Sequence, residues 1–119
     1  MTIEFREATK ADVSAIVALL GDDVLGQTRE QADLSVYMTA FARLAKEPHN
    51  TQIVGVVKGK VVACYQLTII TGLSLTATTR GQIEGVRIAS DLRGQGFGAL
   101  LIDDAEQRAK AAGAELLQL

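Results

Sequence analysis

Three glycines separated by single residues form the segment with the clearest chemical potential in this sequence. They lie in the run Arg93-Gly94-Gln95-Gly96-Phe97-Gly98-Ala99, between a predicted strand and a predicted helix. Glycine removes side chains from a turn, so backbone N–H groups can point into one concavity at the start of the following helix. Arg93 adds positive charge at the rim. The run predicts a site for a phosphate or pyrophosphate; the alternative is a tight turn that needs glycine for its backbone alone.

Two common phosphate-binding motifs fit this run poorly. A P-loop requires Lys and then Ser or Thr after its last glycine, and neither pair follows here. A dinucleotide fingerprint requires G-x-G-x-x-G, whereas this spacing is G-x-G-x-G. Glu115 is about the right distance away to be a ribose-binding acid, but it stands at the start of its predicted strand rather than at the end. Both motifs are therefore disfavoured.

A strand and a short helix are predicted at the N-terminus. Residues 3–7 alternate apolar and polar side chains, as a half-buried strand does. Thr9 and Asp12 have the spacing of a weak helix capping box. Apolar residues then recur at helical spacing, at Val13, Ile16, Val17 and Leu20.

A loop over residues 22–28 and a second helix over residues 29–46 are predicted next, with Pro48 and Asn50 ending the helix. One face of this helix carries Leu34, Met38, Phe41 and Ala45. Such a stripe predicts packing in the core. The alternative is that part of it forms the wall of a substrate pocket.

From Thr51 onward the apolar residues follow the period of strands. Residues 53–57 and 61–65 flank Lys58-Gly59-Lys60, which predicts a hairpin whose glycine has a positive φ. The second strand is expected to reach Ile70. Residues 71–80 contain four threonines and a glycine, which predicts a loop or a frayed strand.

Two further elements flank the glycine run. A strand is predicted over residues 83–89, and a helix follows the run and ends with Gly113 as its cap. The inner face of that helix is expected to carry Leu101, Ile102, Ala105, Ala109 and Ala112. Residues 115–119 begin a last apolar strand.

The predicted order is β-α-α-β-β-β-α-β, with no internal repeat, low-complexity tract or linker. A hairpin-rich sheet followed by a β-α-β unit gives a mixed sheet with helices against it. We therefore expect an α/β (α+β) fold with a mixed, mostly antiparallel sheet, in one domain spanning residues 1–119.

Length and composition exclude several classes of protein. The chain has 119 residues, of which 48% are apolar and 22% charged, as in a soluble globular domain. Twelve Lys and Arg against 14 Asp and Glu give a net charge of −2, which disfavours nucleic-acid binding. No apolar run approaches the roughly 18–20 residues of a membrane helix, and the first residues do not have the pattern of a signal peptide. We expect a cytoplasmic protein.

The other reactive side chains predict no further chemistry. Cys64 is the only cysteine and lies in an apolar strand, so a buried, inert thiol is expected. His49 is expected at the surface. One His and one Cys cannot form a structural zinc site, and Asp103-Asp104 fits a solvated helix face better than a metal pair. No bound metal is expected.

The glycine run also resembles the signature of an enzyme superfamily. Arg93-Gly94-Gln95-Gly96-Phe97-Gly98 matches the pattern (Q/R)-x-x-G-x-(G/A) of the GNAT N-acetyltransferases. The preceding strand and the helix that begins with Ala99-Leu100-Leu101-Ile102 resemble the central motif of that family. The predicted element order resembles its fold from the first strand to the fifth, across essentially the whole chain, which implies that a C-terminal α-β-β part is missing.

This resemblance implies transfer of an acetyl group from acetyl-coenzyme A directly to the amine of a small molecule or peptide. The pyrophosphate would then lie on the amides of Gly94, Gln95, Gly96, Phe97, Gly98 and Ala99, beside Arg93. The pantetheine arm would pair with the backbone of Val86, Arg87 and Ile88. The alternative is a non-catalytic acyl-coenzyme A-binding or regulatory module on the same scaffold.

Glu84 is the candidate general base. It precedes the stretch that would pair with pantetheine, where many relatives place an acidic residue. Strand alternation would put Val86 and Ile88 on its face of the strand and Arg87 on the other. A carboxylate beside two apolar side chains would be partly desolvated, which favours its protonated form. The alternatives are an anchor for the substrate amine and a structural partner for Arg87 or Arg80.

The chain departs from the family pattern at its C-terminal end. The usual acid for the leaving thiolate is a tyrosine on a helix after the fifth strand, and Tyr37 and Tyr65 lie in elements that cannot replace it. Residues 113–119 would also leave an apolar strand edge open, which invites association. A second copy of the chain, in a homodimer, or the rest of a longer chain is expected to cover this edge.

Overall fold

The computed structural model describes residues 1–22 and 32–119. The strands are β1 (Glu4–Glu7), β2 (Asn50–Val57), β3 (Lys60–Ile70), β4 (Arg80–Ile88) and β5 (Leu116–Gln118). The helices are η1 (Lys10–Asp12), α1 (Val13–Leu20), α3 (Leu34–Leu44), α4 (Ser74–Ala77), η2 (Ser90–Leu92) and α5 (Phe97–Ala111). The predicted order is confirmed, with α4 as a short addition. Most of the predicted loop over residues 22–28 and the start of the helix over 29–46 lie outside the described residues.

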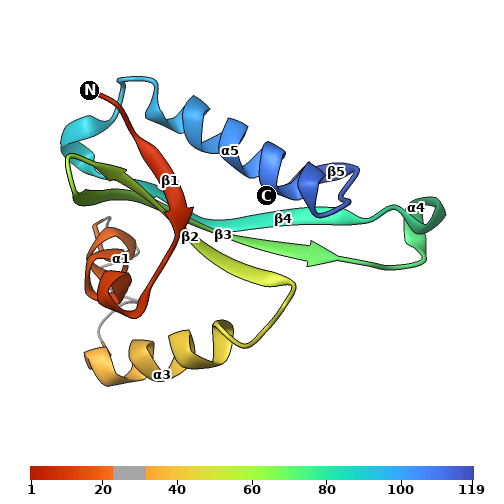
Figure 1. Cartoon of the computed structure of the whole chain (residues 1–119), viewed down its shortest axis with the longest axis horizontal. Helices are drawn as coiled ribbons and strands as arrows, with labels where there is room; N and C mark the ends of the chain where they lie inside the picture. Colours follow the sequence, from red (N-terminus) through yellow and green to blue (C-terminus); the bar gives the residue numbers. More distant parts are fainter. Residues whose placement is uncertain (23–31) are drawn as a thin grey trace.

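The five strands form one sheet in the order β1-β2-β3-β4-β5. The first four are antiparallel neighbours, and β5 runs parallel to β4, with Arg80 opposite Leu116 and Gln82 opposite Gln118. Helix α5 lies along one face of the sheet, and α1 and α3 lie on the other (Figure 1). The mixed, mostly antiparallel α/β fold that the sequence predicts is therefore confirmed.

Alternation along the strands divides the core between the two faces of the sheet. On the α5 face, buried strand residues such as Ile53, Tyr65 and Ile83 pack with Leu101 and Ala105. On the opposite face, Val54 and Cys64 pack with Ile16 and Leu19 of α1. Neighbouring residues of a strand thus pack against different helices, because successive side chains of a strand point to opposite faces of the sheet.

The start of α5 is anchored by an aromatic residue that the predicted inner face omits. Phe97 is buried with Val57 and Val62 of the β2–β3 hairpin, which holds the first turn of α5 against the sheet. Ala112, which the prediction places on the inner face, is instead exposed, because α5 ends at Ala111 and the chain turns at Gly113 with φ +88°.

Two predicted local signals are confirmed. The Thr9 backbone N–H donates to the Asp12 carboxylate at 2.7 Å, which is one half of the capping box before α1. In the β2–β3 turn, Gly59 has φ +77° and Lys58 also has a positive φ, of +50°. Positive φ at both central positions is typical of the tight turns that join twisted antiparallel strands.

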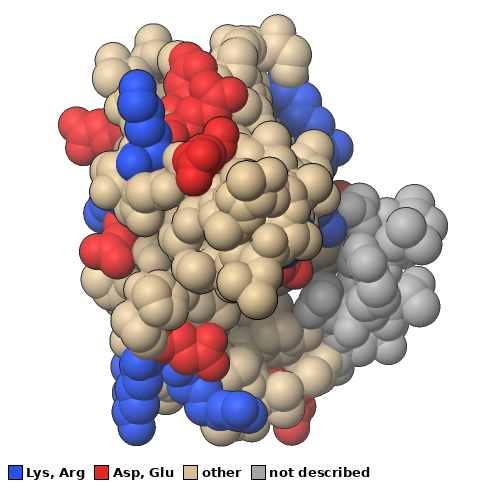
Figure 2. Space-filling model, turned by 90° about the vertical axis from the view of Figure 1, so that its right-hand side faces the viewer, with Lys and Arg blue, Asp and Glu red and all other residues tan. Residues whose placement is uncertain are grey.

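The prediction of a loop or frayed strand over residues 71–80 is wrong in part. Strand β4 begins at Arg80, and α4 forms a turn in which Leu75, Thr76 and Ala77 all have φ between 54° and 60°. Leu73, just before this turn, is 92% exposed. Seen from this end, the molecule has an uncharged centre bordered by acidic and basic side chains (Figure 2).

The apolar stripe on α3 does not enter the core, so that prediction is wrong. No residue of α3 is buried, and Leu34 is 47% exposed. The helix lies outside α1 rather than flat on the sheet (Figure 1), and its inner side chains border a cavity. Of the four stripe residues, Phe41 lines this cavity, so the alternative that part of the stripe forms a pocket wall fits better; that the pocket binds a substrate stays a prediction. Among the described residues, no helix has the length and apolar character needed to cross a membrane.

Candidate functional site

The glycine run forms an open turn at the start of α5. Gly94 has φ +80°, and Gly96, which caps the helix, has φ +85°, conformations that side-chain-bearing residues rarely adopt. A Cβ atom added at Gly94, Gly96 or Gly98 would meet no other atom within 4 Å. The N–H groups in the first turn of a helix have no partner inside that helix. The turn therefore presents backbone donors to open space, as an anion site requires.

The side chains around this turn point away from that open space. Phe97 is buried, so only its backbone faces the concavity. The Arg93 Nε donates to the Ile88 carbonyl at 3.2 Å, and its Nη2 lies 3.8 Å from Asp22 Oδ2. Gln95 reaches the Asp91 carbonyl at 3.5 Å. Arg93 thus lies at the end of β4, from which its guanidinium would have to turn to meet a phosphate.

The edge of β4 beside this turn is open among the described residues. Strand β5 pairs with β4 only from Arg80 to Gln82. The Ala89 N–H donates to the Val62 carbonyl at 2.7 Å, so strand alternation directs the backbone groups of Val86 and Ile88 away from β3. The Val86 carbonyl accepts from Arg87 Nη1 at 2.9 Å, just as Ile88 accepts from Arg93. The carbonyls of Val86 and Ile88 therefore accept hydrogen bonds from arginine side chains. The N–H groups of an extended ligand that pairs like a strand could replace these arginines.

A bulge in β4 changes the face on which Glu84 lies. Glu84 stands opposite Gln66 and Arg87 opposite Cys64, so β4 contains one residue more than β3 between these pairs. Gly85 has φ +61° at the bulge, and a Cβ there would lie 3.6 Å from Leu20 of α1.

The expected surroundings of Glu84 are therefore wrong. Val86 and Ile88 pack on the α5 face, whereas Glu84 shares the α1 face with Arg87. Glu84 is exposed instead of being desolvated between two apolar side chains. Its carboxylate faces the side of the sheet that also carries a cavity.

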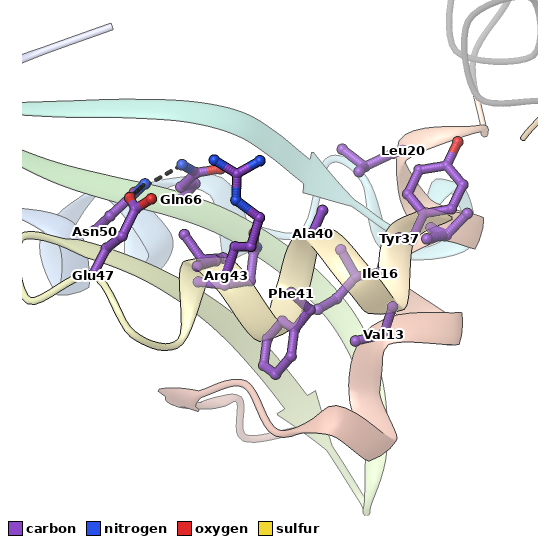
Figure 3. A pocket seen from close by; sticks show the side chains of 13 residues that line it. Val13, Ile16, Leu20, Tyr37, Ala40, Phe41, Arg43, Glu47, Asn50 and Gln66 are labelled. Carbon is purple, nitrogen blue, oxygen red and sulfur yellow. Dashed lines mark hydrogen bonds between the residues drawn. The ribbon is translucent and has the colours of Figure 1, made fainter. Parts of the chain in front are cut away.

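That cavity lies between α1, α3 and the sheet, and its volume is about 370 Å³. Its walls are mainly apolar, with Ile16 and Leu20 from α1 and Phe41 from α3 (Figure 3). Leu20 also faces the bulge of β4, since a Cβ added at Gly85 would lie 3.6 Å from its side chain.

One end of the cavity is polar. Gln66 Nε2 donates to Asn50 Oδ1 at 2.8 Å, and Asn50 Nδ2 donates to Glu47 at 3.1 Å. Thr68 donates to the same Asn50 oxygen at 3.0 Å. Arg43 extends from α3 toward Gln66 above this hydrogen-bonded chain (Figure 3). The end of the cavity next to Glu84 thus combines a cation with fixed amide groups.

Sequence reasoning missed the polar residues of this cavity, chiefly Tyr37, Arg43 and Gln66. Tyr37 and Arg43 lie on α3, beside its apolar stripe, and line the cavity. Gln66 interrupts an apolar strand, which is the one local signal that could have marked it.

A second polar group ties the core to α5. The Tyr65 hydroxyl donates to Asp104 at 2.5 Å, and Arg108 donates to the same carboxylate oxygen at 2.7 Å and to the Phe5 carbonyl at 3.1 Å. Burial, and then Asp104, raise the pKa of Tyr65, so it remains a donor. Asp104 is therefore a structural partner of the core, whereas Asp103 is exposed as expected.

Cys64 and His49 lie as expected. Cys64 is buried, and burial raises the pKa of its thiol to about 12, which leaves it inert. His49 is exposed. Within residues 1–22 and 32–119 no three His, Cys, Asp or Glu side chains are grouped to hold a metal ion.

Known proteins share this arrangement. Residues 13–119 match the Acetyltransferase (GNAT) family. An aminoalkylphosphonate N-acetyltransferase from Salmonella typhimurium is 28% identical over 116 residues, which cover 98% of this chain and 72% of that protein. The crystal structure of a transcriptional regulator from Bacillus halodurans C-125 has a TM-score of 0.93 at 38% identity, over 99% of this chain and 81% of the other.

A third structure is more distant. It is a predicted acetyltransferase with acetyl-CoA from Clostridium acetobutylicum, with a TM-score of 0.76 at 14% identity, over 99% of this chain and 80% of the other. At this identity the likeness concerns the fold. Because the family match spans both the glycine run and the strand before it, this chain belongs to the GNAT family of acetyltransferases.

Proposed function

We propose that this protein transfers an acetyl group from acetyl-coenzyme A to the amine of a small molecule. The observation that carries the proposal is the open turn of glycines at the start of α5, placed beside an open stretch of the β4 edge. The glycine turn is suited to a pyrophosphate, and the open edge of β4 is suited to a linear chain of amides. Coenzyme A contains both groups in sequence.

The backbone positions the acetyl donor. The N–H groups from Gly96 to Ala99 bind the pyrophosphate, and Arg93 moves from Asp22 to add positive charge. The pantetheine amides pair with Val86 and Ile88, replacing the arginine donors that hold these carbonyls. The structure of similar fold solved with acetyl-CoA supports this choice of ligand.

The reaction then takes place between the acetyl donor at the open edge of β4 and the amine on the α1 face of the sheet. The amine nitrogen attacks the thioester carbon, a C–N bond forms, the C–S bond breaks and the coenzyme A thiolate leaves. The attacking nitrogen must lose a proton, and Glu84 is the carboxylate of β4 on the acceptor face, available to take it directly or through water. The cavity between α1 and α3 holds the acceptor.

The name of the Salmonella relative supports a small amine as acceptor. The name of the Bacillus halodurans protein, at 38% identity, favours a second candidate, which is a regulatory module that binds acyl-coenzyme A without turnover.

Two measurements test these functions. Calorimetry should show binding of coenzyme A, and incubation with acetyl-coenzyme A and a panel of amines should release free thiol with an acetylated product visible by mass spectrometry. Binding without turnover on any amine would favour the regulatory module. Absence of coenzyme A binding would contradict both.

A further inference from the structure

We propose that the acceptor amine carries an oxyanion, namely a carboxylate, phosphonate or sulfonate, and that Arg43 binds it. The inference rests on the proposed function, because it assigns the acceptor to the cavity between α1 and α3. It concerns Arg43, which extends over the polar end of that cavity (Figure 3).

Arg43 is the cation among the described residues that line this cavity, and no ion pair between described residues includes it. The ion pairs among the described residues join Arg6 to Asp12, Arg93 to Asp22 and Arg108 to Asp104. Arg43 takes part in none of them. A guanidinium offers a planar set of donors that matches two oxygens of one oxyanion.

The nearest acidic residue is held elsewhere. Glu47 follows Arg43 by four residues and lies beyond the end of α3 at Leu44. Its carboxylate accepts from Asn50 Nδ2 at 3.1 Å. Asn50 is fixed in that orientation, because its oxygen accepts from both Gln66 and Thr68. One oxygen of Glu47 is thus engaged by Asn50, and no ion pair joins Glu47 to Arg43, so the guanidinium can meet a ligand.

The neighbouring strand limits the size of the acceptor. Gln66 lines the cavity beside Arg43 and stands directly opposite Glu84. Residues opposite each other on adjacent strands have Cβ atoms about 4.5–5.5 Å apart. Glu84 does not itself line the cavity, and Gln66 is the cavity residue that stands next to it, so we expect a short acceptor that extends from Arg43 past Gln66 to Glu84. The apolar walls from Ile16, Leu20 and Phe41 accommodate its carbon atoms.

The test compares short amines that differ in the acidic group. Glycine, β-alanine, taurine and 2-aminoethylphosphonate provide the three oxyanions, and ethanolamine and glycinamide provide neutral controls. For the wild-type protein we expect kcat/KM to be at least about tenfold higher for one or more oxyanion-bearing amines, since a charged hydrogen bond of this kind typically changes affinity by about 10- to 100-fold. The preferred member identifies which oxyanion fits.

Variants separate Arg43 from a general effect of charge. Arg43→Gln should raise KM for the preferred acceptor by about 10- to 100-fold, with little change in coenzyme A affinity or in the rate with ethanolamine. Arg43→Lys should recover part of the loss. Lys46→Gln, which removes a cation just beyond α3 and outside the cavity, should change nothing.

A direct binding measurement keeps the test independent of turnover. The side-chain Nε–H signal of Arg43, assigned by its loss in Arg43→Gln, should shift in NMR spectra when glycine, β-alanine, taurine or 2-aminoethylphosphonate is added, with at least one of the four giving a saturable shift, and stay in place with ethanolamine. Equal use of neutral and acidic amines, an unmoved signal, or an equal loss on both kinds of amine in Arg43→Gln would overturn the proposal. Failure to bind coenzyme A or to acetylate any amine would instead contradict the proposed function, and the Arg43 signal would still decide the oxyanion site.

Discussion

Gln66 of β3 and Glu84 of β4 stand directly opposite each other on the face of the sheet that α1 covers. The pairing joins the polar end of the cavity to the carboxylate proposed as general base. It depends on the bulge at Gly85, because without the extra residue Glu84 would share a face with Val86 and Ile88. The bulge thus places the acid on the α1 face of the sheet, while Val86 and Ile88 keep their side chains on the α5 face.

Replacement of Glu84 tests its role as base. Glu84→Gln keeps the shape of the side chain and removes the proton acceptor, so kcat/KM should fall by about 10²–10⁴-fold. Glu106→Gln, on the exposed side of α5, is the matched control and should retain the wild-type rate. A Glu84→Gln protein with an unchanged rate and pH profile would show that Glu84 has no part in proton transfer.

Substitutions in the glycine run test the coenzyme A site. Gly96→Asp brings a carboxylate to the start of α5, and we expect the Kd for coenzyme A to rise by at least about tenfold, equivalent to about 1.4 kcal/mol. Gly96→Asn adds the same bulk without charge and should cost less. Gly98→Ala keeps the backbone N–H, meets no atom within 4 Å and fits the family signature, so affinity should be retained. Calorimetry on the folded variants decides, and equal affinities for Gly96→Asp and wild type would exclude this site.

Asp12 makes the stability of the N-terminal segment depend on pH. Hydrogen bonds from Arg6, at 2.7 and 3.0 Å, and from Thr9 lower the pKa of Asp12 from 3.8 to about 2. Since the folded value lies below the unfolded one, the stabilisation is complete above about pH 4 and disappears as the pH falls through 2. Asp12→Asn should cost up to about 2 kcal/mol at pH 7 and almost nothing at pH 2. Chemical denaturation at both pH values measures this, and a loss that is the same at each would refute the assignment.

The turn formed by α4 contains avoidable strain. Leu75, Thr76 and Ala77 have left-handed backbone conformations that cost roughly 1–2 kcal/mol per residue without glycine. Thr76→Gly should therefore raise the free energy of unfolding by about 1 kcal/mol. Ser74→Gly, in the same turn but without a positive φ, should give no gain. If thermal unfolding shows equal effects of both variants, the turn is not strained at Thr76.

The regular elements could be predicted because their signals are local. The hairpin around Gly59, the cap at Thr9 and the period of α5 each depend on residues close in sequence, and all three are confirmed. The glycine run was located for the same reason, since the turn and the following helix are built from consecutive residues.

The cavity between α1, α3 and the sheet could not be predicted because it depends on distant contacts. A stripe on a helix gives the same pattern whether it enters the core or borders a cavity, and only the position of α3 outside α1 distinguishes the two. Arg43 and Gln66 are far apart in the sequence and line one cavity only because α3 lies over α1 in the folded chain. Gly85 was a signal for a bulge, since an isolated glycine in a strand often marks one, but its effect on Glu84 followed only from the register with β3.

Backbone amide NMR during a titration with acetyl-coenzyme A tests the central claim most directly. The account predicts saturable shifts that are largest at the N–H groups of Gly96, Phe97, Gly98 and Ala99, with a second set along β4 at Val86 and Ile88. The α4 turn, at the far end of the β3–β4 arm, serves as the internal control and should not respond (Figure 1). Saturating ligand that leaves the glycine run unmoved, or shifts confined to other parts of the protein, would contradict the account.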